Sequence, residues 1–365
     1  MTATSQQFLE PAPQQKGPVL VVDDLTVRFP THDGLVEAVT GLSYSVEPGR
    51  TLGIVGESGS GKSVSSMAVL GLHDPRSTRI SGSIKVNGAE VIGAKESTLR
   101  RIRGNEVAMV FQDPLTALHP YFTIGRQIME AYRLHHDVSK KAAKARAVEM
   151  LELVGIPQPD RRVDDFPHQF SGGMRQRAVI AMSLVNNPQL IIADEPTTAL
   201  DVTVQAQILD LMQRLQKEFN SAIIVVTHDL GVVAEMADEV LVMYGGRAVE
   251  FGPTKDVLTR PSMPYTWGLI SSVPDVHEHS DQKLIPIPGS PPSLLNPSPG
   301  CAFAPRCAHK AKVGGDMCDT ELPEFLPLAS NPRHLKRCHL VDPEQIYVDE
   351  VAPEIFAEDS EKLES

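Results

Sequence analysis

The segment that most constrains the fold is a glycine-rich run of eight residues, Gly56-Glu57-Ser58-Gly59-Ser60-Gly61-Lys62-Ser63. It fits the pattern G-x-x-x-x-G-K-S/T, in which glycines let successive backbone N–H groups turn toward a phosphate. The apolar run Leu52–Val55 precedes it and the helical pattern Val64–Leu72 follows it. This order predicts a phosphate-binding loop, with Lys62 on the β- and γ-phosphates and Ser63 on Mg²⁺. A flexible Gly/Ser turn is the alternative, and the flanking elements disfavour it.

Short apolar runs bounded by turn signals recur along the chain and are typical of buried strands. They are Leu25–Phe29, Leu52–Val55, Val107–Phe111, Leu190–Ala193, Ala222–Val226 and Val240–Met243. Helical patterns lie between them, for example from Ser139 to Val154 and from Thr203 to Phe219. Strands that alternate with helices predict an α/β fold whose mostly parallel sheet is covered on both faces.

Polar side chains follow several of these strands at the point where the strand ends. Asp194 and Glu195 come directly after Leu190–Ala193, Gln112 follows the run that ends at Phe111, and His228 follows Thr227. We expect Asp194 to hold Mg²⁺, directly or through water, and Glu195 to polarise an attacking water. Ligands bind beyond the carboxyl ends of parallel strands, so Gln112 and His228 are also candidates. Taken alone, each is more typical of an ordinary polar residue.

Composition divides the chain into four parts. Proline becomes dense and regular periods fade after Arg260, which predicts a domain of residues 19–260 and an extension of residues 261–341. Residues 342–365 hold nine acidic residues and one lysine, and so account for most of the net charge of −12. We expect this tail and the leader, residues 1–18, to be disordered. The charge is local, so a nucleic-acid partner is not indicated.

Neither a membrane span nor a secretion signal is evident. No run reaches the eighteen or so apolar residues that a membrane helix needs. The first residues, Thr2 to Lys16, are polar and rich in Pro and Gln, unlike a signal peptide. We therefore expect the protein to remain in the cytosol and to reach a membrane only through other chains.

A second motif identifies a family. The run Phe170-Ser171-Gly172-Gly173-Met174-Arg175-Gln176 resembles the L-S-G-G-Q signature of ATP-binding-cassette (ABC) ATPases, although it departs from it at the first and last positions. The other motifs follow the family's order: phosphate loop, Gln112, signature, Asp194-Glu195, Thr198-Ala199-Leu200-Asp201 and His228. The resemblance covers roughly residues 19 to 255. It implies an ABC-type P-loop domain with an antiparallel β-subdomain and a helical subdomain.

The resemblance also implies roles for individual residues. Phe29 occupies the place of an aromatic that stacks on adenine, although a core position is the alternative. Gln112 is expected to bind Mg²⁺ and sense the γ-phosphate, while His228 orients that phosphate and the water. Ser171, Gly172 and Gly173 open a helix whose N-terminus faces ATP held by a second subunit. Asp201 is assigned to the nucleotide site as well. Two such chains then enclose two ATP molecules head to tail.

All four cysteines lie in the extension, at Cys301, Cys307, Cys318 and Cys338. Disulfides are unlikely to persist in a cytosolic protein, so tetrahedral zinc, an iron–sulfur cluster and unliganded buried thiols remain open. The histidines His309, His334 and His339 are fallback ligands that we expect to be exposed. We expect any metal to stabilise the extension and to leave the chemistry of the phosphate loop nearly unaffected.

The extension and the segment after Gln112 are similar to those of dipeptide- and oligopeptide-import ATPases. The residues concerned are Pro261–Thr266, Gly300–Cys307, Phe111–Pro114 and Leu118–Pro120. This resemblance implies a [4Fe–4S] cluster on the four cysteines. It also implies two membrane permeases, an extracytoplasmic solute-binding protein, a second ATPase and a location at the cytoplasmic face of the membrane. Importers of nickel chelates or sugars, a soluble ABC ATPase and a nucleotide-sensing subunit are the alternatives.

Overall fold

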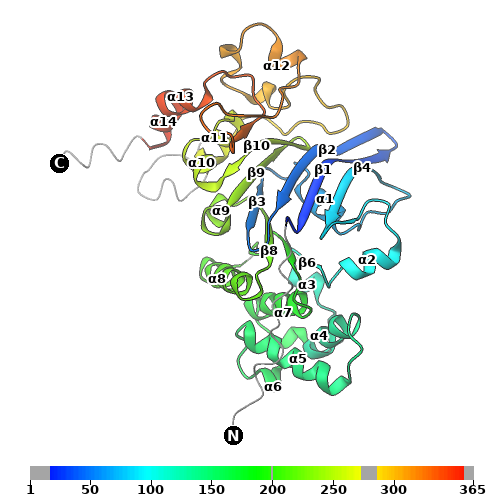
Figure 1. Ribbon diagram of the computed structural model, residues 1–365. Coiled ribbons are helices and arrows are strands. Elements are labelled where there is room, and N and C mark those ends of the chain that lie inside the picture. Colours follow the sequence, from blue (N-terminus) through cyan, green and yellow to red (C-terminus); the bar gives the residue numbers. More distant parts are fainter. Residues whose placement is uncertain (1–16, 199, 273–285, 357–365) are drawn as a thin grey trace, which may run out of the picture.

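The computed structural model describes residues 17–272 and 286–356, apart from Ala199. Most of the predicted leader and the end of the predicted tail therefore lie outside the described residues. The described chain has three parts, a β-subdomain, a central sheet with its helices and a helical subdomain, with the C-terminal extension packed against the sheet (Figure 1). This arrangement confirms the predicted fold class.

The β-subdomain is a four-stranded antiparallel sheet in the order β2-β1-β4-β5. Its strands are β1 (Leu20–Thr31), β2 (Gly34–Val46), β4 (Arg79–Val86) and β5 (Ala89–Glu90). The buried residues of this sheet share one core with helix α1 (Lys62–Val69), which follows the phosphate loop. Helix α2 (Glu96–Ile102) then leads the chain to β6 (Val107–Val110), the strand at one edge of the central sheet.

The central sheet has eight strands in the described residues, in the order β11-β12-β10-β9-β3-β8-β7-β6. Five of them run parallel, and the remaining three are added antiparallel at one edge. In chain order they are β3 (Thr51–Val55), β6 (Val107–Val110), β7 (Leu190–Asp194), β8 (Ala222–Thr227), β9 (Glu239–Tyr244), β10 (Arg247–Pro253), β11 (Leu326–Pro327) and β12 (Leu335–Lys336).

Successive residues of the central strands point into two different cores. Ile191 and Ile223 face the helical side of the sheet, whereas Leu190 and Ile192 face the side shared with the β-subdomain. A strand buried on both faces needs apolar residues at every position, because side chains alternate between the faces. The unbroken apolar runs that predicted these strands therefore reflect burial on both sides.

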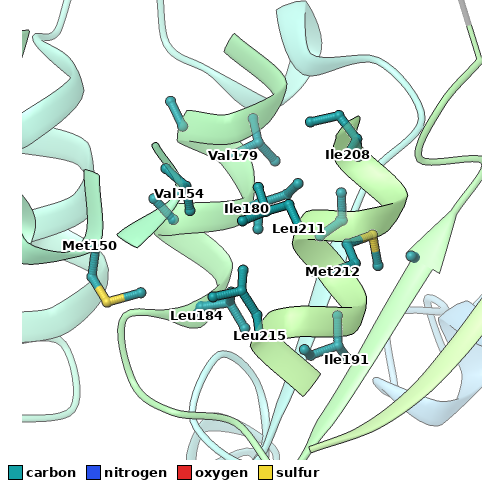
Figure 2. Packing of buried hydrophobic residues seen from close by; sticks show 14 of the residues in the cluster. Met150, Val154, Val179, Ile180, Leu184, Ile191, Ile208, Leu211, Met212 and Leu215 are labelled. Atoms are coloured by element: carbon teal, nitrogen blue, oxygen red, sulfur yellow. The ribbon is translucent and has the colours of Figure 1, made fainter. Parts of the chain in front are cut away.

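Helices α7 (Gly172–Leu184) and α8 (Val202–Phe219) form the centre of the core on one side of the sheet. Figure 2 shows Ile180 and Leu184 of α7 pointing toward Leu211 and Leu215 of α8. The helical subdomain continues through α3 (Pro114–Ala117), α4 (Ile124–Arg133), α5 (Lys140–Leu153) and α6 (Pro159–Arg162). Ser139 caps α5 as predicted, because its hydroxyl accepts the N–H of Ala142.

The C-terminal extension is joined to the central sheet rather than set apart from it. Helices α9 (Leu230–Met236), α10 (Thr254–Thr259) and α11 (Pro264–Ser271) lead into it, and strand β12 then pairs with β10. A short helix α12 (Met317–Thr320) and a 3-10 turn, Ala304–Arg306, carry parts of the cysteine segment. The extension thus covers an edge that would otherwise expose unpaired backbone groups.

The predicted disordered tail is wrong for its first fifteen residues. Helices α13 (Pro343–Ile346) and α14 (Ala352–Phe356) flank a π-helical turn, Tyr347–Val351. Tyr347 and Ile355 are buried with Trp267 and Leu340 in a small core of their own. The prediction of disorder followed the acidic composition and took no account of Tyr347 and Ile355. Burial of these two apolar side chains stabilises the folded segment despite its charge.

Candidate functional site

The phosphate loop joins β3 to α1 and needs glycine at two positions for steric reasons. Gly56 has φ 149°, and a Cβ there would lie 2.2 Å from the carbonyl oxygen of Met243. Gly61 has φ 103°, and a Cβ there would lie 2.4 Å from the carbonyl oxygen of Ala38. Both approaches are closer than any side chain permits, so neighbouring strands fix the path of the loop.

Lys62 opens α1 and folds its side chain back over the loop. Its Nζ donates to the carbonyl oxygens of Gly56, at 2.6 Å, and Glu57, at 3.0 Å. Burial lowers the pKa of Lys62, and the carboxylates of Glu195, Asp194 and Glu57 oppose that shift. The ammonium group therefore lies among acceptors that a phosphate oxygen can replace.

Ser63 and Asp194 come together although 131 positions separate them, with the Ser63 hydroxyl donating to Asp194 Oδ1 at 3.1 Å. Asp194 ends β7, two strands away from the loop that follows β3. Burial raises the pKa of Asp194, with a further rise from Glu195, whereas Ser63 and Lys62 lower it. A hydroxyl and a carboxylate oxygen at this position are hard ligands of the kind that Mg²⁺ prefers.

Glu195 is the meeting point of the other predicted residues. Its carboxylate accepts the Gln112 amide at 2.8 Å and the Thr198 hydroxyl at 2.9 Å, and His228 Nδ1 lies 3.3 Å from it. The backbone at Glu195 has φ 49°, a left-handed conformation that is strained for a side-chain-bearing residue. The structure thus brings Gln112, Glu195 and His228 together at the carboxyl ends of β6, β7 and β8. Thr198 belongs to the quoted run Thr198-Ala199-Leu200-Asp201, but its bond to Glu195 was not predicted.

The signature run opens α7 and faces outward. The Ser171 hydroxyl accepts the N–H of Met174 at 3.3 Å, while Ser171 and Gly172 are exposed. Gly173 needs its small size, because a Cβ there would lie 2.9 Å from Val204. Gln176, the last residue of the quoted signature run, is buried and donates to the carbonyl of Pro196 at 2.8 Å, a contact that was not predicted. It ties the signature helix to the loop that follows Glu195.

Two further nucleotide-site predictions have ordinary structural explanations in the chain itself. Phe29 lies on β1, half-buried, and its ring meets His73 edge-on with centroids 5.7 Å apart. Asp201 caps α8, since its carboxylate accepts the N–H of Val204 at 3.0 Å. Ala199, in the same run, lies outside the described residues. The contacts of Phe29 and Asp201 do not test their predicted roles toward a nucleotide.

The four cysteines gather around one apolar core. Cys301 and Cys318 are buried, and Cys307 and Cys338 pack against the same group of side chains. Burial raises the pKa of Cys301 to about 11 and that of Cys338 to about 12, and neighbouring cysteines add to both shifts. The backbone N–H of Cys301 also donates to the carbonyl of Cys318 at 2.8 Å. None of the four described cysteines forms a disulfide.

At the four thiols the structure shows no preformed site for a single metal ion. Across residues 17–272 and 286–356, no group of three or more His, Cys, Asp or Glu side chains is arranged to hold a metal ion. His334 is not an exposed fallback ligand either, because it is 1% exposed and its Nε2 lies 2.7 Å from Glu250. His339 contacts the carbonyl of Glu321 at 2.9 Å, and His309 lies edge-on to Trp267.

The fold and the phosphate-loop geometry define the class of this chain, an ABC-type P-loop ATPase. The ABC transporter family model matches residues 39–198, and the model of the oligopeptide/dipeptide transporter C-terminal region matches residues 249–313. The second match includes Cys301 and Cys307, while Cys318 and Cys338 lie beyond it. The chain belongs to the family of ABC ATPases of oligopeptide transport.

Named relatives support this membership over most of the chain. The oligopeptide transport ATP-binding protein OppD of Bacillus subtilis is 51% identical over 296 residues, which are 81% of this chain and 83% of the relative. OppD of Salmonella typhimurium is 47% identical over 327 residues, 90% of this chain and 95% of the relative. Among solved structures, the dimeric ATP-binding cassette MJ0796 bound to ADP and phosphate matches with a TM-score of 0.58 at 26% identity. That match covers 64% of this chain and 98% of the other.

None of the helices in residues 17–272 and 286–356 combines the length and the apolar character that a membrane crossing requires.

Proposed function

We propose that this chain hydrolyses ATP to power the uptake of di- and oligopeptides across the cytoplasmic membrane. The observation that carries the proposal is that the phosphate loop, Asp194 and Glu195 lie together at the carboxyl ends of the central strands. The match of its C-terminal region to that of oligopeptide and dipeptide transporters supports the choice of solute. Importers of nickel chelates or sugars, a soluble ABC ATPase and a nucleotide-sensing subunit remain the alternatives that an experiment must separate.

In this proposal, the loop N–H groups and Lys62 bind the β- and γ-phosphates of ATP. Ser63, Asp194 and Gln112 are the ligands for Mg²⁺, which neutralises phosphate charge when it is bound. Glu195 accepts the proton of the attacking water, and His228 orients that water against the γ-phosphate. The bonds of Glu195 to Gln112 and His228 support these roles, because they place all three side chains within reach of one water.

The signature residues serve a second ATPase subunit. Ser171, Gly172 and Gly173 lie at the N-terminus of α7, where unpaired N–H groups favour an anion. Their exposure supports the idea that the anion is the γ-phosphate held by a partner chain, with Asp201 at the edge of the same contact. The partner is either a second copy or a paralogue. ATP then closes the pair and hydrolysis reopens it.

The remaining partners are two membrane permeases and an extracytoplasmic solute-binding protein, so the chain works at the cytoplasmic face of the membrane. We place the permease contact between Gln112 and Phe170. A groove of about 890 Å³ lies in that stretch, lined by α4 and by residues of α5. Tyr121, in the segment between α3 and α4, is 81% exposed, which is unusual for so large an aromatic residue.

The permease contact is tested by photo-crosslinking in the assembled transporter. A photoreactive side chain at Tyr121 should crosslink to a permease, whereas one at Val341, which is 87% exposed on the extension, should not. Crosslinks from position 341 alone would overturn the assigned surface. In proteoliposomes with the solute-binding protein, oligopeptides should stimulate ATP hydrolysis. Stimulation only by nickel chelates or sugars would overturn the peptide assignment.

We also propose that Cys301, Cys307, Cys318 and Cys338 hold one [4Fe–4S] cluster. Their gathering around one apolar core supports this choice. A cluster takes one thiolate per iron, so its ligands need not surround a single point as zinc ligands do. The raised pKa values of the thiols mean that loading releases protons, since only thiolates bind the metal.

The test is anaerobic purification followed by visible absorption and analysis of iron, sulfide and zinc. A brown protein with about four iron and four sulfide per chain is the expected result. A colourless protein with one zinc per chain would replace the cluster with a zinc site. A metal-free protein with four titratable thiols would overturn both.

A further inference from the structure

Glu57, the second residue of the phosphate loop, is held by the C-terminal part of the chain at both its backbone and its side chain. Its N–H donates to the hydroxyl of Tyr265, on α11, at 2.7 Å. Its carboxylate accepts two hydrogen bonds from Arg306, at 2.6 Å from Nη1 and 3.0 Å from Nη2. Such a bidentate pair fixes direction as well as distance, because the guanidinium fork matches the carboxylate.

Arg306 is itself immobilised, because every one of its five N–H groups has an acceptor. Besides the two bonds to Glu57, Nε donates to the carbonyl of Pro288 at 2.7 Å, Nη1 to the Tyr244 hydroxyl at 3.1 Å and Nη2 to the carbonyl of Ile287 at 3.2 Å. The side chain of Arg306 is 5% exposed and that of Glu57 26%. The bonds to Glu57 and Tyr244 hold the pKa of Arg306 above its usual range, so the residue stays charged.

The backbone that these contacts fix is the backbone that positions Lys62. The carbonyls of Gly56 and Glu57 are the two acceptors of the Lys62 ammonium group. Glu57 also places a negative charge on the loop that must accept phosphate, and an unpaired carboxylate there would repel the nucleotide. Arg306 neutralises that charge and turns the carboxylate toward the extension.

We propose that Arg306 is a positioning residue for nucleotide binding, acting through Glu57 to pre-organise the phosphate loop. This inference rests on the proposed function, and it adds that the C-terminal extension sets the nucleotide affinity of the ATPase domain. Arg306 directly precedes Cys307, and Phe303 and Ala304 share the core that holds the cysteines. A change that loosens the cysteine segment therefore reaches the phosphate loop through Arg306, while Tyr265 still holds the Glu57 backbone. The inference predicts a stronger coupling than the expectation that a metal in the extension leaves the chemistry of the loop nearly unaffected.

The test compares Arg306→Lys with Arg337→Lys in the purified full chain. Arg337 also ties the extension to the sheet, since its Nε donates to Ala248 and its Nη1 to Pro323, both at 2.9 Å, but it does not contact Glu57. Titration with ADP and with MgATP should show binding about tenfold weaker in Arg306→Lys, as expected for one lost charge-assisted hydrogen bond. Arg337→Lys should bind both nucleotides as the unmodified chain does.

A double-mutant cycle separates positioning from general damage. In a Glu57→Gln background, Arg306→Lys should weaken ADP binding by much less than tenfold, because the paired carboxylate is already gone. Equal affinity of Arg306→Lys and the unmodified chain would overturn the inference, as would an equal loss in Arg337→Lys. An unmodified chain that bound no nucleotide would instead overturn the proposed function. Melting temperature is followed in every variant, and a loss of affinity that tracks it across both arginine variants also counts against positioning.

Discussion

The nucleotide site and the cysteine segment lie on the same sheet, yet their polar groups are handled in opposite ways. At the nucleotide site, carboxylates that follow strands accept hydrogen bonds from neutral polar groups, as Asp194 does from Ser63 and Glu195 from Gln112. In the cysteine segment, thiols from short turns are enclosed by apolar side chains, and burial keeps them protonated.

The difference shows how each region becomes ready for a ligand. Pairs at the nucleotide site are weak enough to exchange for phosphate oxygens and water, because most of their members are at least partly exposed to solvent. The buried thiols would have to give up their protons to bind the proposed cluster, and this would couple cluster loading to folding of the segment. The ion pair of Arg306 with Glu57 joins the C-terminal extension, which holds the cysteine segment, to the phosphate loop of the nucleotide site.

Replacing Glu195 by Gln should have the largest effect and should fall on only one of the two regions. The amide keeps the size of the side chain but cannot accept a proton, so turnover should drop about 10²- to 10⁴-fold. ATP binding and the reactivity of the cysteines should be unchanged. Steady-state hydrolysis, an ATP-binding titration and thiol alkylation measure the three quantities.

Glu239→Gln is the matched control. Glu239 forms an ion pair with Arg333 and lies far along the chain from Asp194 and Glu195. It should hydrolyse ATP at the normal rate. Hydrolysis by Glu195→Gln within a factor of a few of the unmodified rate would show that another group removes the proton.

Sequence reasoning predicted which strand-end side chains lie together, because that information is local. A strand that is buried on both faces is an unbroken apolar run, and its carboxyl end is marked by the polar residue that follows. The same rule placed Gln112, Glu195 and His228 near one another without any knowledge of distances. Their mutual hydrogen bonds depend on neighbouring strands, which the topology alone defines.

The extension was harder to predict because long-range packing determines it. Strand β12 has two residues and gains its partner only from β10, far earlier in the chain. His334 is polar, and nothing local indicates that Glu250 removes it from solvent. The fold of the acidic tail rests on Tyr347 and Ile355, two anchors that composition averages out. The contact of Arg306 with Glu57 joins positions 249 residues apart.

His334→Ala should have the next largest effect. It tests whether one buried pair, His334 with Glu250, keeps the cysteine segment folded and its thiols protected from reagents. His334 and Glu250 are 1% and 0% exposed, and Glu250 also accepts the N–H of Ser262 at 2.6 Å. Removal of the imidazole leaves a buried carboxylate short of a partner, which should destabilise the chain by about 3 kcal/mol. Urea unfolding measures that loss, and native-state alkylation should show faster reaction of the four thiols.

Arg333→Ala is the control for this change, because it alters the adjacent residue and also breaks an ion pair, with Glu239 at 2.8 Å. That pair is exposed, so its loss should cost about 0–1 kcal/mol and leave the thiols protected. Equal effects of the two substitutions would show that the buried pair does not hold the extension closed.

Phe29→Ala should have the smallest effect, and it decides whether this residue belongs to the nucleotide site. Phe29 is half-buried and contacts His73 edge-on, so a core role and an adenine-stacking role predict different results. If the ring stacks on adenine, ATP affinity should fall by about 0.5–1.5 kcal/mol, which is roughly two- to tenfold. Inorganic triphosphate has no base, so its affinity should not change. Equal losses for ATP and triphosphate, together with a lower melting temperature, would assign Phe29 to the core of the β-subdomain.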